Sequence, residues 1–593
     1  MYLEKINSPQ DLKTLSINEL SVLSDEIRQT LVKRLSEFGG HIGPNLGVVE
    51  LTVALHYVFN SPVDKIVFDV SHQSYTHKIL TGRKVAFMDK NHYRDVSGFT
   101  NPRESEHDFF RVGHTSTSIS LASGLAIARD RKGGKENIIA FIGDGSLSGG
   151  EALEALDNAG EYKNNLIIIL NDNQMSIPEN HGGLYKNLQL LRESKGANPF
   201  NFFKVLGLDY LYIEDGHNIP LLVDKLNSIK DIDHPIVVHV NTIKGKGLKF
   251  AEEHQEMWHA GGPFNPETGE RNRPYLIETP SELSYQHLSK KMREDKDIFV
   301  VMSSTPLVLN FTPERRKEFK DQFIDVDICE EHAMGLISGM ARGGIKPVYG
   351  IFASFIQRTY DQILQDICLN NSPVTIIVDG GSICGGNDET HLGIFDISML
   401  TNIPNLIYLA PTSIEEYFAM VDYSIDQNKH PIAIRMPISI THNLYPFDSD
   451  YSDINKFQVV EKGSKIALIG VGNSFILTKE VFELLKKENI NATLINPRFI
   501  SGLDEPLLNE LKKEHQIVVT IEDGILSGGF GQKVSSYFGN SGVRVLNYGV
   551  KKQFYDQFKL DDVLNDCHLK KELISEDVIK LLEEMNNGKQ GKK

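Results

Sequence analysis

The sequence predicts an α/β protein of three domains, with mostly parallel sheets that are covered by helices. Two observations predict this class. The chain has 593 residues, which is too many for a single hydrophobic core. Short apolar runs rich in β-branched residues alternate with helix-like patterns along almost the whole chain, as they do when helices connect parallel strands. In such open sheets we expect ligands at the carboxyl ends of the strands.

The first predicted domain covers residues 1–285. Its clearest strands are residues 137–142 and 166–170, with a helix-like stretch between them. The domain ends after residues 261–269, a loop segment rich in glycine and proline.

The second predicted domain covers residues 286–450 and the third covers residues 451–593. Apolar runs predict strands at residues 299–302, 347–350 and 374–378 of the second domain, and at residues 465–470 and 518–522 of the third. Residues 586–593 are polar and basic, so we expect them to be disordered.

Composition and charge are those of a globular protein. Hydrophobic residues make up 40% of the chain, charged residues 24%, and the net charge is −17. Because the chain is acidic, we expect neither nucleic acid nor an anionic membrane as a partner. The four cysteines have no C-x-x-C spacing, so the sequence indicates neither a zinc site nor a disulfide framework. We expect no signal peptide and no membrane span, and the cytoplasm is the default location.

Two motifs at predicted strand ends indicate a site for Mg²⁺ and a diphosphate. Gly143-Asp144-Gly145 follows the first strand, and Asn171-Asp172-Asn173 follows the second. Mg²⁺ prefers hard oxygen ligands, and Asp144 and Asn173 supply two of them. The glycines let the backbone approach a phosphate, and a helix N-terminus favours the anion. The first motif alone is common in ordinary turns, but its pairing with the second is typical of thiamine diphosphate enzymes.

Longer motifs identify the family that the chain resembles. They are D-V-S-H-Q-S-Y-T-H-K-I-L-T-G-R at residues 69–83, G-H-T-S-T-S-I-S at 113–120, E-E-H-A at 330–333, F-I-Q-R-T-Y-D-Q at 355–362 and T-H-L-G-I-F-D at 390–396. With these motifs the chain is similar, almost end to end, to the 1-deoxy-D-xylulose-5-phosphate synthase branch of the transketolase superfamily. The resemblance implies a transketolase-like thiamine diphosphate-binding fold with diphosphate, pyrimidine and C-terminal domains. It also implies a homodimer, with each active site between the first two domains of one chain.

The resemblance implies a transferase that uses thiamine diphosphate and Mg²⁺. Such an enzyme decarboxylates pyruvate and passes the two-carbon acyl unit to an aldehyde such as glyceraldehyde 3-phosphate. The family product, 1-deoxy-D-xylulose 5-phosphate, is a precursor of isoprenoids, thiamine and pyridoxal. Two enzyme alternatives stay open: a transketolase that moves a glycolaldehyde unit from a ketose, and an E1-like component of a 2-oxoacid dehydrogenase. A catalytically inactive binding protein is disfavoured because Asp144, Asn173 and Glu330 are all present.

Site roles follow from the resemblance, motif by motif. Glu330 is implied to face the cofactor's aminopyrimidine and to promote loss of the C2 proton, which requires a partly buried carboxyl group with a raised pKa. His41 and His259 are implied to converge on the reacting carbonyl, where a histidine can donate a proton or a hydrogen bond near neutral pH. His391 is assigned to the same catalytic set.

The remaining assignments concern ligand binding. The implied cofactor ligands, besides Glu330, are His72, Gly113, His114, Thr115, Gly145, Ser146, Asn173 and Phe355. The implied metal ligands are Asp144, Asn173 and the backbone carbonyl of Met175. The implied substrate contacts are Phe352, Arg358, Asn387 and Arg435. We expect His77, His107 and His217 to be structural.

The chain departs from the family pattern on the acceptor side. Gly380 and Ile438 stand where the family places two arginines that hold the acceptor phosphate. Phe352 stands in place of a tyrosine, Asn387 in place of an aspartate, and Leu248 in place of a tyrosine in the first domain. An arginine holds a phosphate through a charge-assisted pair of hydrogen bonds, each worth roughly 1.5–3 kcal/mol. The sequence therefore predicts weak use of glyceraldehyde 3-phosphate or a different acceptor aldehyde.

Overall fold

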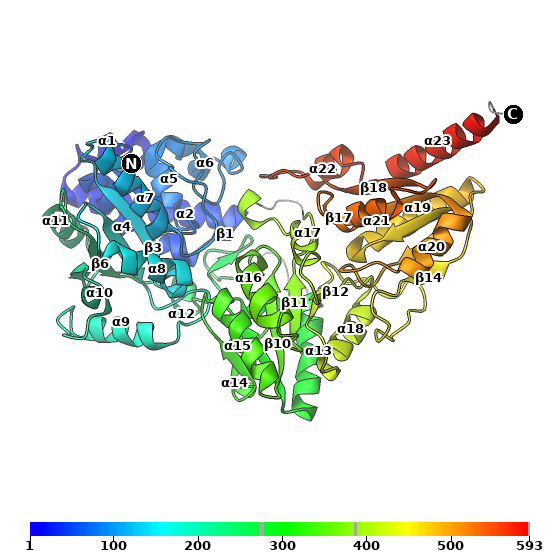
Figure 1. The fold of residues 1–593 in the computed structure, drawn as a ribbon. Helices are drawn as coiled ribbons and strands as arrows, with labels where there is room; N and C mark the ends of the chain where they lie inside the picture. Colours follow the sequence, from blue (N-terminus) through cyan, green and yellow to red (C-terminus); the bar gives the residue numbers. More distant parts are fainter. Residues whose placement is uncertain (272–277, 385–387, 591–593) are drawn as a thin grey trace. The chain divides into compact units, whose positions relative to one another are not determined.

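The computed structural model describes residues 1–271, 278–384 and 388–590 (Figure 1). The chain divides into two compact units. The first consists of Met1–Leu276 with Val326–Cys329, and the second consists of Ile277–Asp325 with Glu330–Lys593. The domain boundaries predicted near residues 285 and 450 stay predictions.

The first unit is built on a five-stranded parallel sheet. The strand order is β2-β3-β4-β6-β5. Its strands are β2 (Lys65–Phe68), β3 (Ile138–Gly143), β4 (Ile167–Asp172), β5 (Asp209–Ile213) and β6 (Ile236–Asn241). A separate antiparallel pair joins β1 (Gly40–His41) to β7 (Ala260–Gly261). The strands predicted at residues 137–142 and 166–170 are confirmed as β3 and β4.

Helices flank this sheet. They are α1 (Pro9–Leu12), α2 (Ile17–Phe38), α3 (Gly43–Leu46), α4 (Val49–Val58), α5 (Tyr75–Lys78), α6 (Val85–Met88), α7 (Ser118–Arg131), α8 (Gly150–Ala159), α9 (Gly183–Glu193), α10 (Phe202–Val205), α11 (Ile219–Ser228) and α12 (Lys249–Glu253).

Side chains of β3 alternate between two hydrophobic clusters. Ile139 and Phe141 pack with residues of α2, α4 and α11, whereas Ile138, Ala140 and Ile142 pack with residues of α7 and α8. All five side chains are fully buried. The strand is therefore apolar without interruption because both faces of a parallel sheet are covered.

The second unit contains two sheets. The six strands of one sheet are all parallel, in the order β12-β13-β11-β10-β8-β9. They are β8 (Ile298–Met302), β9 (Phe323–Asp325), β10 (Lys346–Phe352), β11 (Thr375–Asp379), β12 (Ile407–Leu409) and β13 (Ile432–Arg435). Its helices are α13 (Pro280–Glu294), α14 (Pro313–Glu318), α15 (Glu330–Arg342), α16 (Tyr360–Gln362), α17 (Asp396–Leu400) and α18 (Ile414–Asp426).

The other sheet of this unit has five strands in the order β14-β16-β15-β17-β18, of which only β14 is antiparallel to its neighbour. They are β14 (Gln458–Glu461), β15 (Lys465–Gly470), β16 (Thr493–Asn496), β17 (His515–Ile525) and β18 (Arg544–Val550). The helices are α19 (Phe475–Lys487), α20 (Glu505–Glu514), α21 (Phe530–Phe538), α22 (Leu560–Asp566) and α23 (Lys571–Gln590). The predicted α/β class with mostly parallel sheets is confirmed.

The C-terminal segment differs from its prediction. Helix α23 continues to Gln590, so the expectation of disorder is wrong for residues 586–590, and residues 591–593 lie outside the described part. The physical reason is that Ile574, Val578 and Leu582 are buried in the hydrophobic cluster that covers β15 and β17. This apolar stripe at helical spacing anchors the helix, and its polar end extends beyond the anchored turns.

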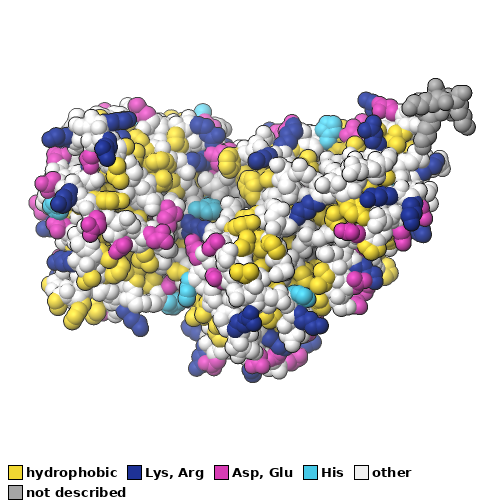
Figure 2. Space-filling model, viewed as in Figure 1, with side chains coloured by type: hydrophobic (Ala, Val, Ile, Leu, Met, Phe, Trp, Pro, Cys, Tyr) yellow, Lys and Arg dark blue, Asp and Glu magenta, His cyan; other side chains and the backbone are white. Residues whose placement is uncertain are grey.

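The surface agrees with the expectation of a globular protein. Figure 2 shows charged side chains of both signs spread among apolar ones over the visible face. Within the described ranges, no helix is both long and apolar enough to cross a lipid bilayer.

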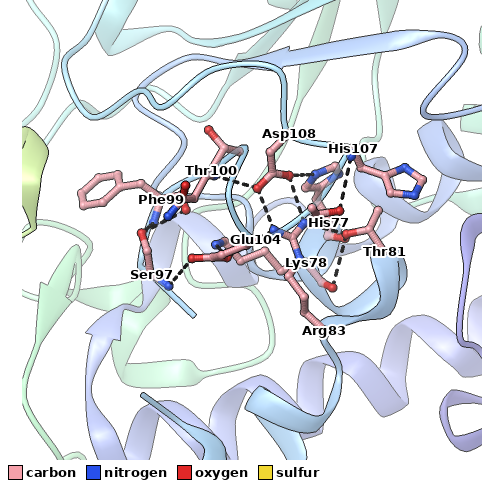
Figure 3. A network of polar contacts seen from close by, with 12 residues as sticks. His77, Lys78, Thr81, Arg83, Ser97, Phe99, Thr100, Glu104, His107 and Asp108 are labelled. Carbon is pink, nitrogen blue, oxygen red and sulfur yellow. Dashed lines mark hydrogen bonds and ion pairs between the residues drawn. The ribbon is translucent and has the colours of Figure 1, made fainter. Parts of the chain in front are cut away.

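A network of buried charged side chains joins α5 and the π-helical turn after it to the loop at residues 97–108 of the first unit (Figure 3). His77 Nε2 lies 2.7 Å from Asp108 Oδ1, and Arg83 donates two hydrogen bonds to the same carboxylate, at 2.6 and 2.9 Å. Lys78 pairs with Glu104, and Arg83 also approaches Glu104 at 3.3 Å. Burial alone would raise the pKa of Asp108, but the hydrogen bonds from His77 and Arg83 outweigh it and lower that pKa below its ordinary value.

We predict that Asp108→Asn destabilises the first unit, because Arg83 and His77 stay buried without their carboxylate. Removing one partner of a buried ion pair typically costs about 3–5 kcal/mol. Urea unfolding should therefore begin at a lower concentration in the variant. The matched control is Asp95→Asn, which removes an exposed pair with His92 and should change the midpoint little. Equal midpoints for the two variants would contradict the prediction.

Candidate active site

Two strand ends of the first unit bring predicted metal ligands to one edge of the sheet. Strands β3 and β4 run in parallel with Gly143 opposite Asn171, and the Asp144 N–H donates to the Asn171 carbonyl at 3.0 Å. Asp144 directly follows β3, and Asn173 directly follows β4. The carboxylate and the amide thus leave the sheet at neighbouring positions.

The two aspartates at this edge have different partners. Asp172 is fully buried and lies 2.7 Å from His239 Nε2, and Arg192 forms an ion pair with the same oxygen. Asp144 is also buried, and it accepts a hydrogen bond at 2.9 Å from the neutral Asn180 side chain. Burial, and then the neighbouring Asp172 charge, raise the pKa of Asp144 well above its ordinary value. A bound cation would stabilise the ionised form of this buried carboxylate.

The residues at this edge fit Mg²⁺ and a diphosphate. Mg²⁺ binds through a few protein oxygens together with phosphate oxygens, and a carboxylate, an amide and a backbone carbonyl form such a set. Asn173 Oδ1 accepts the Met175 N–H at 3.2 Å, so the second and third predicted ligands are tied together. A Cβ at Gly145 would lie 2.6 Å from the Cβ of Ser176, so this close approach requires glycine.

An open cavity of about 600 Å³ adjoins the same strand ends. Its lining includes Asn173, Met175 and Asn180, together with the cationic side chains of Lys186 and Arg192. The lining is mostly polar, which suits a charged ligand better than an apolar one.

Lys244 is a further charged group of this region that the sequence motifs did not single out. Its side chain is buried, and its ammonium group donates to the Ser176 carbonyl. Burial lowers its pKa to about 7, although the nearby Asp144 opposes the shift. The signal that could have found it is Lys244-Gly245 in a glycine-rich turn directly after β6.

Three of the predicted histidines form a triangle in the first unit. The ring centroids of His41 and His72 are 5.0 Å apart, those of His41 and His259 are 5.7 Å apart, and those of His72 and His259 are 5.3 Å apart. His41 ends β1, and His259 precedes the paired strand β7, with His41 opposite Ala260. The short antiparallel pair therefore brings together histidines that are more than 200 residues apart in sequence.

The imidazole of His259 is held neutral by its surroundings. Burial lowers its pKa well below the ordinary value, and the positive charge of Lys244 lowers it further. A neutral imidazole can still donate a hydrogen bond to an oxyanion through its protonated nitrogen.

The loop that contains Gly113, His114 and Thr115 is fixed by a buried carboxylate. Asp69 accepts the N–H groups of Ser116 and Ser118 at 2.8 and 2.9 Å, and it is fully buried. The Ser116 hydroxyl donates to the carbonyl of Ser146 at 2.7 Å, which joins this loop to the turn after Asp144. These contacts place four predicted cofactor ligands on two loops that touch: Gly113, His114, Thr115 and Ser146.

The three histidines expected to be structural each have a side-chain partner inside the first unit. His77 contacts Asp108, His107 Nδ1 lies 2.8 Å from Ser61 Oγ, and His217 Nδ1 lies 3.0 Å from a Glu50 carboxylate oxygen.

Glu330 begins α15 in the second unit. Its side chain is 5% exposed, and burial raises its pKa, while the guanidinium of Arg358, 3.6 Å away, opposes the shift. This is the environment that the sequence led us to expect. Burial favours the protonated form of this carboxyl group, and the neighbouring cation favours the ionised form.

Aromatic rings connect other predicted site residues of this unit. The ring centroids of Phe355 and His391 are 5.6 Å apart, and those of Phe352 and Phe355 are 5.9 Å apart. His391 Nδ1 lies 2.8 Å from the Thr390 hydroxyl oxygen, and burial lowers the pKa of this histidine.

The two positions that replace the family's arginines present no cation. Gly380 has φ +70°, where a side chain is strained, and a Cβ there would lie 3.8 Å from the Phe352 ring. Ile438 is 40% exposed and presents an apolar side chain. The backbone at Gly380 therefore suits glycine and disfavours a return to arginine.

Arg435 does not fit its predicted role as a substrate contact. Its side chain is 1% exposed, its Nε donates to Asp396 at 2.8 Å, and its guanidinium also pairs with Asp523. Tyr408 donates to the same Asp396 carboxylate. The guanidinium is thus enclosed by two aspartates, and we no longer count it among the substrate ligands. Asn387 lies outside the described residues.

A parallel sheet with a carboxylate, an amide and a carbonyl at its strand ends fits the class of α/β enzymes that bind a phosphorylated cofactor through a metal ion.

Comparisons with known proteins identify the family within this class. The family model described as 1-deoxy-D-xylulose-5-phosphate synthase matches residues 3–201 and 192–242. The model of the transketolase pyrimidine binding domain matches residues 280–442, and that of the transketolase C-terminal domain matches residues 455–574.

Curated relatives match nearly the whole chain. The 1-deoxy-D-xylulose-5-phosphate synthase of Halothermothrix orenii is 38% identical over 622 residues, covering 98% of this chain and 97% of that protein. That of Clostridium tetani is 37% identical over 619 residues, covering 98% of this chain and 99% of that protein. A solved structure of a Pichia stipitis transketolase mutant is 17% identical, covers 95% of this chain and 97% of that chain, and aligns with a TM-score of 0.44.

The chain belongs to the 1-deoxy-D-xylulose-5-phosphate synthase family. It is accordingly a transferase of the transketolase type that works with thiamine diphosphate and a divalent metal ion.

We predict that Asp144→Ala abolishes the metal-dependent binding of thiamine diphosphate, because the cofactor's negative charge loses its metal bridge. Isothermal titration calorimetry with and without Mg²⁺ measures this. Asp157→Ala, at an exposed position of α8, is the control and should bind with wild-type affinity. Wild-type cofactor affinity in Asp144→Ala would show that the metal ligands are elsewhere.

Proposed function

We propose that this chain decarboxylates pyruvate and transfers the two-carbon acyl unit to an aldehyde, using thiamine diphosphate and Mg²⁺. The observation that carries the proposal is that this chain retains both the predicted metal ligands and the predicted acid that acts on the aminopyrimidine of the cofactor. Asp144 and Asn173 stand at neighbouring strand ends of the first unit, and the buried carboxyl of Glu330 begins α15 in the second.

Each half has a distinct task in the proposal. Asp144, Asn173 and the Met175 carbonyl bind Mg²⁺, and Gly145 and Ser146 approach the diphosphate with the loop of Gly113, His114 and Thr115. The bound cofactor supplies the nucleophilic carbon and the electron sink. Glu330 would hold the proton that activates the aminopyrimidine ring for loss of the C2 proton. Phe355 would pack beside that ring.

The histidines deal with charge at the substrate. Decarboxylation and ligation both create an oxyanion, and hydrogen-bond donors in a water-poor site stabilise it. In the proposal His41, His72 and His259 provide such donors from the first unit, and His391 provides one from the second. Arg358 remains a substrate contact in the proposal.

Further parts of the proposal rest on family membership alone. They are a homodimer, a cytoplasmic location and a product that enters isoprenoid and thiamine biosynthesis. Mg²⁺ rather than another divalent ion is proposed because all the expected ligands are hard oxygens.

We expect Glu330→Gln to keep the cofactor bound but to slow deuterium exchange at its C2 atom by orders of magnitude, since an amide cannot exchange the proton. Proton NMR of the bound cofactor follows this exchange. The adjacent variant Glu331→Gln is the control and should exchange at the wild-type rate. If Glu331→Gln were the slow variant instead, the role would belong to Glu331.

The acceptor is where the proposal departs from ordinary family members. Gly380 and Ile438 offer no charge to a phosphate, Arg435 is enclosed by Asp396 and Asp523, and Arg358 lies against Glu330. We therefore propose an acceptor aldehyde without a phosphate group, or one whose phosphate contributes little to binding.

Steady-state kinetics with glyceraldehyde 3-phosphate and with glyceraldehyde test this. We expect little preference for the phosphorylated acceptor. Ile438→Arg should raise kcat/KM for glyceraldehyde 3-phosphate by roughly 10–100-fold, as a charge-assisted hydrogen bond implies. Ile438→Gln should leave this kcat/KM unchanged. A strong preference of the wild type for glyceraldehyde 3-phosphate would contradict the proposal.

A further inference from the structure

The carboxamide of Asn45 joins the two segments that carry His41 and His72. Asn45 lies in α3 and is fully buried. Its Nδ2 donates to the His41 carbonyl at 2.8 Å and to the His72 carbonyl at 2.7 Å, and its Oδ1 accepts the Tyr75 N–H at 2.9 Å. Both donor hydrogens and one acceptor site of the carboxamide are therefore used in fixing backbone groups.

These three contacts close a ring of interactions. The Tyr75 hydroxyl in turn accepts the N–H of His41 at 3.4 Å. The segments of His41 and His72 are thus tied at the carbonyl of each histidine by Asn45 and again through Tyr75. The imidazoles that these backbones carry are the pair with the smallest ring separation of the triangle, 5.0 Å.

The backbone before His72 is strained and needs such support. Val70 has φ +54° and Ser71 has φ +67°, both in the left-handed region. For the β-branched Val70 this is a true outlier, and a residue persists in this conformation only where its surroundings enforce it. Ser71 is held by two hydrogen bonds of its hydroxyl, to the Val112 carbonyl and from the Thr100 N–H, each at 2.9 Å. Asn45 holds the next residue, His72.

We propose that Asn45 is a positioning residue, which fixes His41 and His72 relative to each other so that their imidazoles and that of His259 face one substrate oxygen. This inference rests on the proposed function for the role of the histidines. The positioning itself is a property of the first unit and can be measured without substrate or cofactor.

Three substitutions separate the interactions. Asn45→Asp keeps the shape and the acceptor for Tyr75, but sets a carboxylate oxygen against two carbonyl oxygens. Asn45→Ala removes all three hydrogen bonds. Asn45→Ser retains a single donor and is the mildest change, so it supplies a folded variant if the others are unstable.

Asn165 provides a matched control. It is buried in the same unit, its Nδ2 donates to Asn137 Oδ1 and to the Ile232 carbonyl at 2.9 Å each, and its Oδ1 accepts the Ile138 N–H at 3.1 Å. Like Asn45, it donates two hydrogen bonds and accepts one, although one of its acceptors is a side-chain oxygen. It lies at the amino ends of β3 and β4, however, whereas the site lies at their carboxyl ends. Asn165→Asp therefore measures the loss of stability without a change at the histidines.

The first readout is NMR of the apo protein with ¹⁵N-labelled histidine, with resonances assigned through His41→Gln and His72→Gln. We expect the imidazole signals of His41 and His72 to shift in Asn45→Asp, and less in Asn45→Ser, but to be unchanged in Asn165→Asp. Unchanged imidazole signals in folded Asn45→Asp and Asn45→Ser, or equal shifts in Asn165→Asp, would overturn the inference.

The second readout is CO₂ release from pyruvate at saturating cofactor. We expect kcat of Asn45→Asp to fall at least about tenfold, since a misplaced donor weakens transition-state contacts, while C2 exchange stays at the wild-type rate and Asn165→Asp keeps its kcat. Absence of pyruvate turnover in the wild type would count against the proposed function only, because the NMR result stands by itself. Shifted signals with an unchanged kcat would overturn the link to catalysis.

Discussion

Strands β3 and β4 are buried on both faces, and this constraint determines where the chemistry of the first unit can lie. A side chain inside either strand has no access to water, so most strand positions are apolar, and the polar Asn171 and Asp172 stand at the carboxyl end of β4, where each has a side-chain partner. Asp144 and Asn173 directly follow these strands, whose parallel register sets Gly143 opposite Asn171. The turn after β3 must also pass close to Ser176, which requires Gly145. The predicted metal ligands and the glycine of the turn therefore lie together at this edge.

Charge balance decides which of the buried acids can bind a cation. Asp172 and Asp108 each form an ion pair with an arginine and contact a histidine, and Arg435 pairs with two aspartates. These groups have their partners inside the protein and hold elements together. Asp144 accepts a hydrogen bond from the neutral Asn180 side chain, and burial and the neighbouring Asp172 charge raise its pKa, although Lys244 opposes the shift.

The histidine triangle depends on backbone that is costly to form. Two consecutive residues with positive φ precede His72. Asn45 donates to the His72 carbonyl, and the Ser71 hydroxyl and the Asp69 carboxylate accept the N–H groups of Thr100 and Ser116. Such strain persists only where the surroundings enforce it, and it is concentrated at functional sites. In this corner the hydrogen bonds of three buried side chains, Asn45, Ser71 and Asp69, enforce the backbone conformation.

The sequence by itself determined the α/β class, the strands β3 and β4, the two strand-end motifs and the buried carboxyl at the start of α15. These are local properties, because alternation, turn chemistry and motif spacing are set by residues near each other in the chain. Only the tertiary structure decided that Arg435 is enclosed by Asp396 and Asp523, that Lys244 is buried near Asp144, and that Asn45 joins His41 to His72. It also showed that α23 continues to Gln590. Partners of this kind come from distant parts of the chain, and burial and charge compensation select them only once the elements have packed.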